Sequence, residues 1–290
     1  MTDGEKSKWG PDDESGARNL IDAAATLRGL SSVKTGEVIG LGIEIKGGSR
    51  GPAAPMRPAA QHFMTRDGGD YSAGLEEKFG FGFSDDVIQL ATHGTTHIDA
   101  LAHVWRDGIM YNGFSPNDVT SVGAKHLGID KLEPIVTRGI FVDLALDEEE
   151  GQGHPITCRQ LSCAVEKAGV VPAAGDALLV RTGWMSAWRN KKADSERSTG
   201  LHHDCSDWII NSGFALVAAD NIAVEVLPSL DPSSAVPLHI SLIRDNGIYL
   251  AELFDLEVLA QKQRNTFLFM LSALRIKGGV GSPINPVVVL

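Results

Sequence analysis

Three short aliphatic segments constrain the fold of this 290-residue chain more than any other feature of the sequence. Residues 139–143, 177–181 and 214–218 consist mainly of Val, Leu, Ile, Phe and Ala, and Gly or Asp residues flank them. Such runs are too short for helices and are typical of strands that are buried inside a protein. The sequence therefore predicts at least three buried strands.

Helical patterns separate these strands. Thr157 can cap a helix over residues 158–168, in which apolar residues recur at helical spacing and Gly169 supplies the stop. A second helix is expected over residues 203–211, closed by Gly213. Strands that alternate with helices indicate an α/β chain, but the pattern leaves open the order of the strands and whether the sheet is parallel throughout.

The composition is that of an acidic globular protein. With 26 Lys+Arg and 37 Asp+Glu, the formal net charge is −11 and the pI is about 5.2. Such a chain repels phosphate backbones and anionic lipids, so we expect neither nucleic acid nor a membrane surface as a partner. No run approaches the ~18 apolar residues of a membrane span, and residues 1–6 lack the basic-then-apolar order of a secretory signal.

The cysteines and the irregular stretches indicate how the chain is organised. Its three cysteines form no CxxC pair, which argues against a disulfide framework or a structural zinc site. We therefore expect a cytoplasmic protein. Residues 1–20 are predicted to form an irregular N-terminal arm, and residues 46–70, with three prolines, a loop. No linker divides the chain, so residues 1–290 are predicted to be a single domain.

A run of histidines indicates the chemistry. It reads His93-Gly94-Thr95-Thr96-His97-Ile98-Asp99-Ala100-Leu101-Ala102-His103. In an extended chain His97 and Asp99 project from the same face, and Gly94 lets the chain bend so that His93 joins them. Two imidazoles and a carboxylate suit a divalent ion such as zinc or manganese, whereas calcium would require more oxygen ligands. The alternative is that these histidines lie at the surface or are hydrogen-bonded in the core.

Residues around this run extend the hypothesis. His103 is either a further ligand or a general base suited to work at neutral pH. Four aromatic residues near the run are predicted either to line a pocket for an aromatic substrate or to pack in the core; they are Phe81, Phe83, Trp105 and Tyr111.

Other polar residues are weaker candidates. Residues 202–205 resemble a second metal cluster but are more simply ordinary polar residues at a helix start. Asp220 and Asn221 follow a predicted strand end, where side chains often face a site. Glu225 could reach the same cleft but is expected to be solvated, and the acidic run 147–150 is expected to be a solvated loop.

The run from His93 to His103 resembles the signature of the cyclase family, which includes bacterial kynurenine formamidases and isatin hydrolase. That signature is a His-Gly-Gly-Thr-His-x-Asp-x-Pro-x-His run. Thr95 stands here in place of the second glycine and Leu101 in place of the proline, which leaves the presumed ligands unchanged. The resemblance extends from the segment 9–13 through residues 111–113 to the segment 281–286.

The resemblance implies a site, a fold and an assembly. It implies that His93, His97 and Asp99 bind a metal and that His103 is the catalytic acid/base. A later His and Glu of the family correspond to His239 and Glu252. The family fold is an α/β swivelling β/β/α arrangement, and its members are homodimers or larger homo-oligomers. The number of metal ions stays open.

The predicted function is metal-dependent hydrolysis of a C–N amide bond, in a linear formamide or a cyclic lactam or imide. A metal makes water a better nucleophile and polarises the carbonyl, while an acid/base group protonates the departing nitrogen. Two alternatives remain. One is a metal-dependent lyase or isomerase that acts next to a metal-bound carbonyl. The other is a noncatalytic protein that binds a metal or a small ligand.

Overall fold

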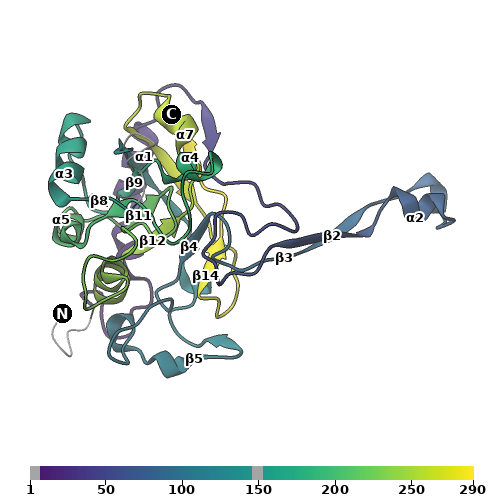
Figure 1. Ribbon diagram of the computed structural model, residues 1–290, viewed down its shortest axis with the longest axis horizontal. Coiled ribbons are helices and arrows are strands. Elements are labelled where there is room, and N and C mark those ends of the chain that lie inside the picture. The colour runs from purple at the N-terminus through teal and green to yellow at the C-terminus, as the bar shows by residue number, and fades with distance from the viewer. Residues whose placement is uncertain (1–6, 146–152) are drawn as a thin grey trace.

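The protein is built on one mixed sheet of nine strands. The computed structural model describes residues 7–145 and 153–290 (Figure 1). In spatial order the strands are β1 (Val38–Gly40), β15 (Val287–Val289), β13 (Thr266–Leu271), β7 (Ile135–Asp143), β9 (Ala177–Arg181), β11 (Leu216–Ala219), β12 (Tyr249–Glu252), β4 (His97–Asp99) and β14 (Gly281–Pro283).

The centre of this sheet is parallel and its flanks are antiparallel. β7, β9, β11 and β12 pair in parallel, whereas β12 with β4, β4 with β14, and β7 with β13 pair antiparallel. The three predicted strands are confirmed as β7, β9 and β11. β11 and the first four residues of β9 are fully buried, which explains why they read as continuous apolar runs instead of alternating ones.

Within the described residues, seven helices connect the strands, and all but α2 belong to the body that holds the large sheet. Their bounds are α1 (Ala23–Ser31), α2 (Gly68–Ser72), α3 (Cys158–Lys167), α4 (Trp184–Arg189), α5 (Ser206–Asn211), α6 (Pro237–His239) and α7 (Glu257–Ala260). The prediction of α3 is confirmed, because the Thr157 hydroxyl accepts a hydrogen bond from Gln160 N. The second predicted helix begins with a 3₁₀ turn over His203–Cys205 and continues as α5.

A long hairpin projects from this body. β2 (Gln61–Arg66) and β3 (Asp85–Gln89) form an antiparallel ribbon with α2 near its end, and we call residues 61–89 the projecting hairpin (Figure 1). The prediction of a loop over residues 46–70 is therefore wrong for its second half. The strand was not recognised because its side chains have no buried face to produce an alternating pattern: every residue from 61 to 65 is exposed.

Two further strand pairs lie outside the large sheet: β5 (Val119–Thr120) with β6 (Gly123–Ala124), and β8 (Pro155–Ile156) with β10 (Gly200–Leu201). Residues 7–20 are irregular apart from a 3₁₀ turn over Gly16–Leu20, and Trp9 packs against the core, as expected for this segment. The acidic run 147–150 lies outside the described residues. Within residues 7–145 and 153–290, no helix has both the length and the apolar character that crossing a bilayer requires.

Candidate metal centre

β4 carries the first part of the site. Its three residues lie between β12 and β14, so both of its edges are hydrogen-bonded. Ile98 points into the core and is fully buried, while His97 and Asp99 share the opposite face, with 3.6 Å between His97 Nε2 and Asp99 Oδ1. His93 joins them from the preceding turn, its Nε2 lying 3.3 Å from the same oxygen. The extended interpretation of the histidine run is thus confirmed in its geometry.

His239 and Glu252 approach this cluster from distant parts of the chain. Glu252 is the last residue of β12 and pairs with His97 across the sheet, which brings its carboxylate 3.3 Å from His97 Nε2. His239 ends α6, and its Nε2 lies 3.2 Å from Glu252 Oε1 and 3.7 Å from Asp99 Oδ2. The structure therefore places together all the residues that the resemblance suggested as ligands.

Hydrogen bonds at Nδ1 fix the orientation of the imidazoles. Nδ1 of His97 lies 2.7 Å from the carbonyl oxygen of Thr95, and Nδ1 of His93 lies 3.0 Å from the Thr92 hydroxyl. Occupying Nδ1 leaves each Nε2 directed at Asp99. This pattern is common for histidines that bind metals, because the partner at one nitrogen sets the tautomer and the ring orientation at the other.

Glu225 has a role that the sequence did not predict. It is 1% exposed instead of solvated. Its carboxylate accepts hydrogen bonds from the backbone N–H groups of Leu238 and His239 and lies 2.6 Å from His239 Nδ1. Glu225 therefore holds the start of α6 and aims Nε2 of His239 at Asp99 and Glu252. Nothing in the sequence indicated that Glu225 is buried, because its partners are backbone N–H groups at the start of a helix farther along the chain.

His103 lies at the mouth of the cluster. Its ring stacks on that of His93 with 4.2 Å between centroids, and its Nε2 is 4.0 Å from Asp99 Oδ1. Its side chain is 22% exposed, against 4% for His93 and 3% for His97. His103 is thus the histidine of the run with the best access to a molecule entering from solvent.

Burial and mutual charge perturb the titration of the cluster. Burial alone would raise the pKa of Asp99, but the facing imidazoles of His103 and His93 outweigh it and hold this pKa well below its ordinary value. Burial opposes protonation of His97 and His239, yet Glu252 and Glu225 respectively raise the pKa of each. The buried carboxylates therefore require positive charge nearby, from protons or from a cation.

The donor atoms fit a divalent metal ion. His93 Nε2 and both carboxylate oxygens of Asp99 are buried and make no hydrogen bond to any described residue. Buried polar atoms are normally paired, and these three face one another at a distance where a cation would satisfy them together. The donors form two sets that share Asp99, namely His93, Asp99 and His103, and His97, Asp99 and Glu252.

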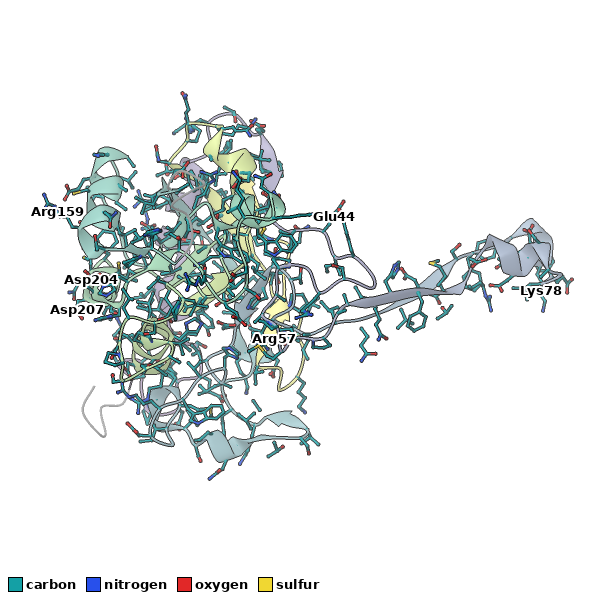
Figure 2. All side chains as sticks on the ribbon, viewed as in Figure 1. Glu44, Arg57, Lys78, Arg159, Asp204 and Asp207 are labelled. Atoms are coloured by element: carbon teal, nitrogen blue, oxygen red, sulfur yellow. The ribbon has the colours of Figure 1, made fainter. Side chains whose placement is uncertain are left out.

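A cavity of about 530 Å³ opens onto this cluster. His93, His97, His103, His239 and Glu252 line it together with Ser195 and Glu196, and aliphatic side chains form most of the rest of its wall. Arg57 also lines it, with a buried Nε that has no hydrogen-bond partner among the described residues. Figure 2 shows Arg57 near the root of the projecting hairpin, whose far end carries Lys78. The sequence did not single out Arg57, because the prolines and glycines around it indicated only a loop.

The four aromatic candidates do not line this cavity. Phe81 and Phe83 belong to the projecting hairpin and are 67% and 45% exposed. Trp105 is 52% exposed and is not part of the cavity wall. Tyr111 is buried, and its hydroxyl donates to the Asp13 carboxylate and is hydrogen-bonded to the Ser7 hydroxyl, so it secures the N-terminal segment. These corrections share one cause: nearness in sequence to His93 did not carry over to nearness in space.

Three further candidates from the sequence, the cluster 202–205, Asp220 and Asn221, have structural roles. Asp204 accepts a hydrogen bond from Cys158 N at the start of α3, which gives the cluster 202–205 a structural role. Asp220 is buried and accepts from the backbone and hydroxyl of Thr182 and from the backbone of Gly183, while the amide of Asn221 donates to the Thr199 carbonyl. Both residues fix the loops that follow the ends of β9 and β11.

Comparison with known proteins then assigns the family. The family model described as "Putative cyclase" matches residues 39–226, well over half of the chain. The chain belongs to the cyclase family. A solved structure described as a novel cyclase is 34% identical, covers 98% of both chains and has a TM-score of 0.87. The expected cyclase-like α/β fold is therefore confirmed.

Solved structures that are less similar in sequence share the fold. Isatin hydrolase A from Labrenzia aggregata bound to benzyl benzoate is 18% identical, covers 87% of this chain and 93% of that chain, and has a TM-score of 0.67. A structure described as a predicted metal-dependent hydrolase from Bacillus stearothermophilus is 16% identical, covers 87% of this chain and 97% of that chain, and has a TM-score of 0.54. A search of curated proteins finds no match.

Proposed function

We propose that this cyclase-family protein is a metal-dependent hydrolase that cleaves a C–N amide bond in a small molecule, either a linear formamide or a cyclic lactam or imide. One observation carries the proposal. The two carboxylate oxygens of Asp99 are buried, accept no hydrogen bond from any described residue and face the imidazoles of histidines that line a cavity. A group that only stabilised the fold would have its hydrogen bonds satisfied.

Five residues are proposed as ligands: His93, His97, Asp99, His239 and Glu252. Their mix of imidazole and carboxylate donors suits zinc or manganese. When bound, such an ion supplies Lewis acidity, which polarises a carbonyl and lowers the pKa of water. A solved structure that shares this fold and is described as a predicted metal-dependent hydrolase supports this proposal.

His103 is proposed as the acid/base. Burial lowers its pKa to about 4, although Asp99 partly opposes this shift, so its ring is uncharged at neutral pH and can accept a proton. Its position between the cluster and the cavity lets it take a proton from water on one side and deliver it to the departing nitrogen on the other. Without that delivery an amine leaves poorly, which is why an amide needs both an activated water and an acid.

Arg57 is proposed to bind the substrate. Its unpaired Nε lies in the cavity wall, and a guanidinium binds carboxylate or carbonyl oxygens through charge-assisted hydrogen bonds. Hydrolysis of a cyclic amide generates a carboxylate, and formamide hydrolysis releases formate. A cation at the cavity wall suits either product.

Metal analysis followed by a substrate screen tests the proposal. The purified protein should contain zinc or manganese, and it should hydrolyse at least one member of a panel of aryl formamides, lactams and cyclic imides. In water enriched in ¹⁸O, the product must carry the label, because hydrolysis incorporates solvent oxygen. A product without label would assign the protein to the lyase or isomerase alternative. Metal binding without turnover of any panel member would favour a noncatalytic binding protein.

The assembly and the location are part of the proposal. We expect a homodimer or larger homo-oligomer acting on a small-molecule substrate, with neither nucleic acid nor membrane as a partner. Cys158, Cys163 and Cys205 are all unpaired thiols, which supports a cytoplasmic location.

A further inference from the structure

A second cavity lies next to the one that opens onto the proposed metal centre. It has a volume of about 440 Å³, which is within the range of small-molecule sites. Its wall comes mainly from the segment 42–52, from α4, and from Gly94 and Thr95, and we call it the α4 groove. No described residue lines both cavities, but one segment of chain passes from the first to the second, since Pro52 lines the groove and Ala54 lines the other cavity.

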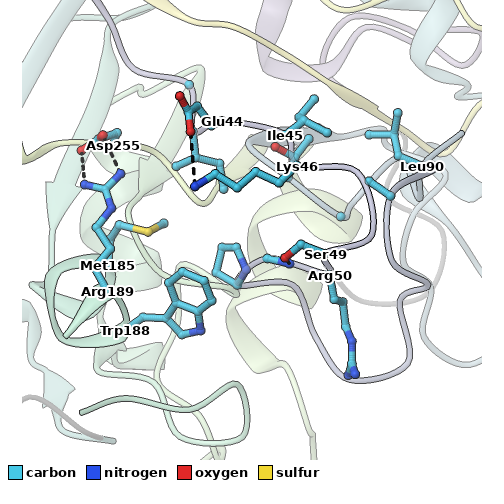
Figure 3. Close-up of a pocket in the computed structure, with 17 residues that line it drawn as sticks. Glu44, Ile45, Lys46, Ser49, Arg50, Leu90, Met185, Trp188, Arg189 and Asp255 are labelled. Carbon is cyan, nitrogen blue, oxygen red and sulfur yellow. Dashed lines mark hydrogen bonds and ion pairs between the residues drawn. The ribbon is translucent and has the colours of Figure 1, made fainter. Parts of the chain in front are cut away.

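The α4 groove contains an apolar slot. Met185 and Pro52 are buried, Trp188 is partly buried, and Ile45 is 44% exposed. Figure 3 shows Ile45 and Lys46 on one side of the opening and Trp188 on the other. The face of an indole makes favourable stacked or edge-to-face contacts with another ring, in addition to the area that they bury. The slot therefore favours a flat aromatic group.

The α4 groove is positively charged, although the chain as a whole is acidic. Its wall carries three basic and two acidic side chains, a net charge of +1, and these are Lys46, Arg50, Arg189, Glu44 and Asp255. The whole chain has a net charge of −11. A local reversal of sign concentrates anions at that part of the surface. The groove therefore suits a ligand that is both aromatic and negatively charged.

Lys46 is the cation that such a ligand would bind. Arg189 is held by Asp255 through two hydrogen bonds of 3.1 and 2.7 Å. The Lys46 ammonium group pairs with Glu44 at 3.5 Å, and these two side chains are 73% and 83% exposed. Ion pairs that are so exposed contribute little, so an anion in the groove can compete with Glu44. Arg50 extends away from Trp188 in Figure 3 and adds only to the general positive potential.

The α4 groove also contacts the turn that positions two of the proposed metal ligands. Gly94 and Thr95, which line the groove, directly follow His93 in the chain. The carbonyl oxygen of Thr95 lies 2.7 Å from Nδ1 of His97. A ligand that contacts this turn therefore acts on the orientation of both imidazoles. Because linkage is reciprocal, a metal bound by these imidazoles must change the affinity of the groove by the same factor.

We propose that the α4 groove is a second ligand site, which binds a planar aromatic monocarboxylate and is coupled to the proposed metal centre. The ring lies in the slot against Trp188, and the carboxylate binds the Lys46 ammonium group. An aromatic cation would meet the net positive charge of the groove, and a small inorganic anion would leave the apolar slot empty. The binding itself does not depend on which reaction the metal centre catalyses.

Calorimetric titration of the full-length protein with 2-naphthoate tests the binding. Binding should be saturable, and the uncharged 2-naphthamide should bind at least about 10-fold more weakly, the worth of a hydrogen bond to a charged group. Lys46→Met keeps the aliphatic stem and removes the charge, so it should weaken 2-naphthoate binding by a similar factor, as should Trp188→Leu. The matched controls are Lys34→Met and Trp105→Leu, which change an exposed lysine and an exposed tryptophan outside the groove and should bind as the wild type does.

The other cavity is the competing location for an aromatic carboxylate, because Arg57 lines it. Arg57→Ala should therefore leave 2-naphthoate binding to the groove intact. Loss of binding in Arg57→Ala, binding that survives both Lys46→Met and Trp188→Leu, or equal affinities for 2-naphthoate and 2-naphthamide would each overturn the proposal. Absence of saturable binding, as expected if another part of the protein fills the groove in solution, would overturn it as well. Circular dichroism confirms that each variant is folded.

The coupling is tested by repeating the titration on zinc-loaded protein and on protein stripped with a chelator. The two dissociation constants should differ by about 5-fold or more, the usual size of coupling between sites. Elemental analysis measures the zinc content of each sample. Equal constants in protein that does hold zinc would overturn the coupling alone. Protein that holds no zinc would contradict the proposed metal centre, and with it the coupling, while the variants above still decide whether the groove binds the carboxylate.

Discussion

The histidine cluster and the projecting hairpin are neighbours in sequence, since the hairpin ends at residue 89 and the cluster begins at residue 93, yet their environments are opposite. The cluster residues His93, His97 and Asp99 are at most 5% exposed and are held by strands from distant parts of the chain. The hairpin is exposed along both strands and contacts its own body only at the root. Contacts with distant parts of the chain thus hold the first region, whereas the second is held mainly by the pairing of its own two strands.

The largest effect is expected at the centre of the cluster. Asp99→Asn removes the negative charge shared by both donor sets, so bound metal should be lost and kcat/KM should fall by at least about 10³-fold. Elemental analysis and turnover measure this. The matched change in the hairpin, Asp86→Asn, affects an exposed carboxylate paired with His62 and should leave metal content intact. An Asp99→Asn protein with full metal content would contradict the ligand assignment.

The next effect separates proton transfer from metal binding. His103→Ala should keep its metal and lose roughly 10²- to 10⁴-fold in turnover. Because burial holds the pKa of His103 near 4, below its ordinary value, the neutral base persists as pH falls through 6. The acid limb of the wild-type rate due to this group should therefore lie below pH ~5. His62→Ala in the hairpin is the control and should change neither quantity. Loss of metal in His103→Ala would make His103 a ligand.

A glycine pair tests how closely the cluster is packed. A Cβ at Gly281 would overlap the His93 imidazole, whereas one at Gly68 in α2 meets no atom within 4 Å. Gly281→Ala should therefore displace His93 and weaken metal binding by about 10- to 100-fold, measured by competition with a chelator. Gly68→Ala should leave metal affinity unchanged. Equal affinity in both variants would show that His93 can move or is not a ligand.

An effect of similar size is expected on substrate binding. Arg57→Ala should raise KM by about 10- to 100-fold, the worth of a hydrogen bond to a charged group, and should change kcat less. Steady-state kinetics on the best substrate of the panel measures this split. Arg66→Ala in the hairpin is the matched control, because Arg66 lies over the ring of Phe83 outside the cavity. A fall in kcat alone would instead place Arg57 at the reacting atoms.

The sequence pattern correctly predicted features that depend only on residues close together in the chain. The alternation of a strand placed His97 and Asp99 on one face, and Thr157 with Gly169 bounded a helix correctly. Contacts between distant segments were not accessible in this way. Glu225 is buried because a helix start fourteen residues later donates two backbone N–H groups to it.

The aromatic residues also show that the sequence does not reveal contacts between distant segments. Phe81 is close to His93 along the chain, but the ribbon of β2 and β3 carries it away from the body. Tyr111 is held by Ser7 and Asp13, a contact across about a hundred residues. Neither outcome depends on the residue type, since a Phe or Tyr suits a pocket, a core or an interface equally well.

The place of β4 between β12 and β14 bears on how the protein is made. A ribosome delivers His93, His97 and Asp99 well before the two strands that must flank β4 on either side. At roughly 5 to 20 residues per second, about 10 to 40 s separate the emergence of His103 from that of Gly281. During that interval the nascent chain carries exposed imidazoles that any available cation can reach. The proposed ion site is therefore complete only at the end of translation, when the C-terminal strands enclose β4.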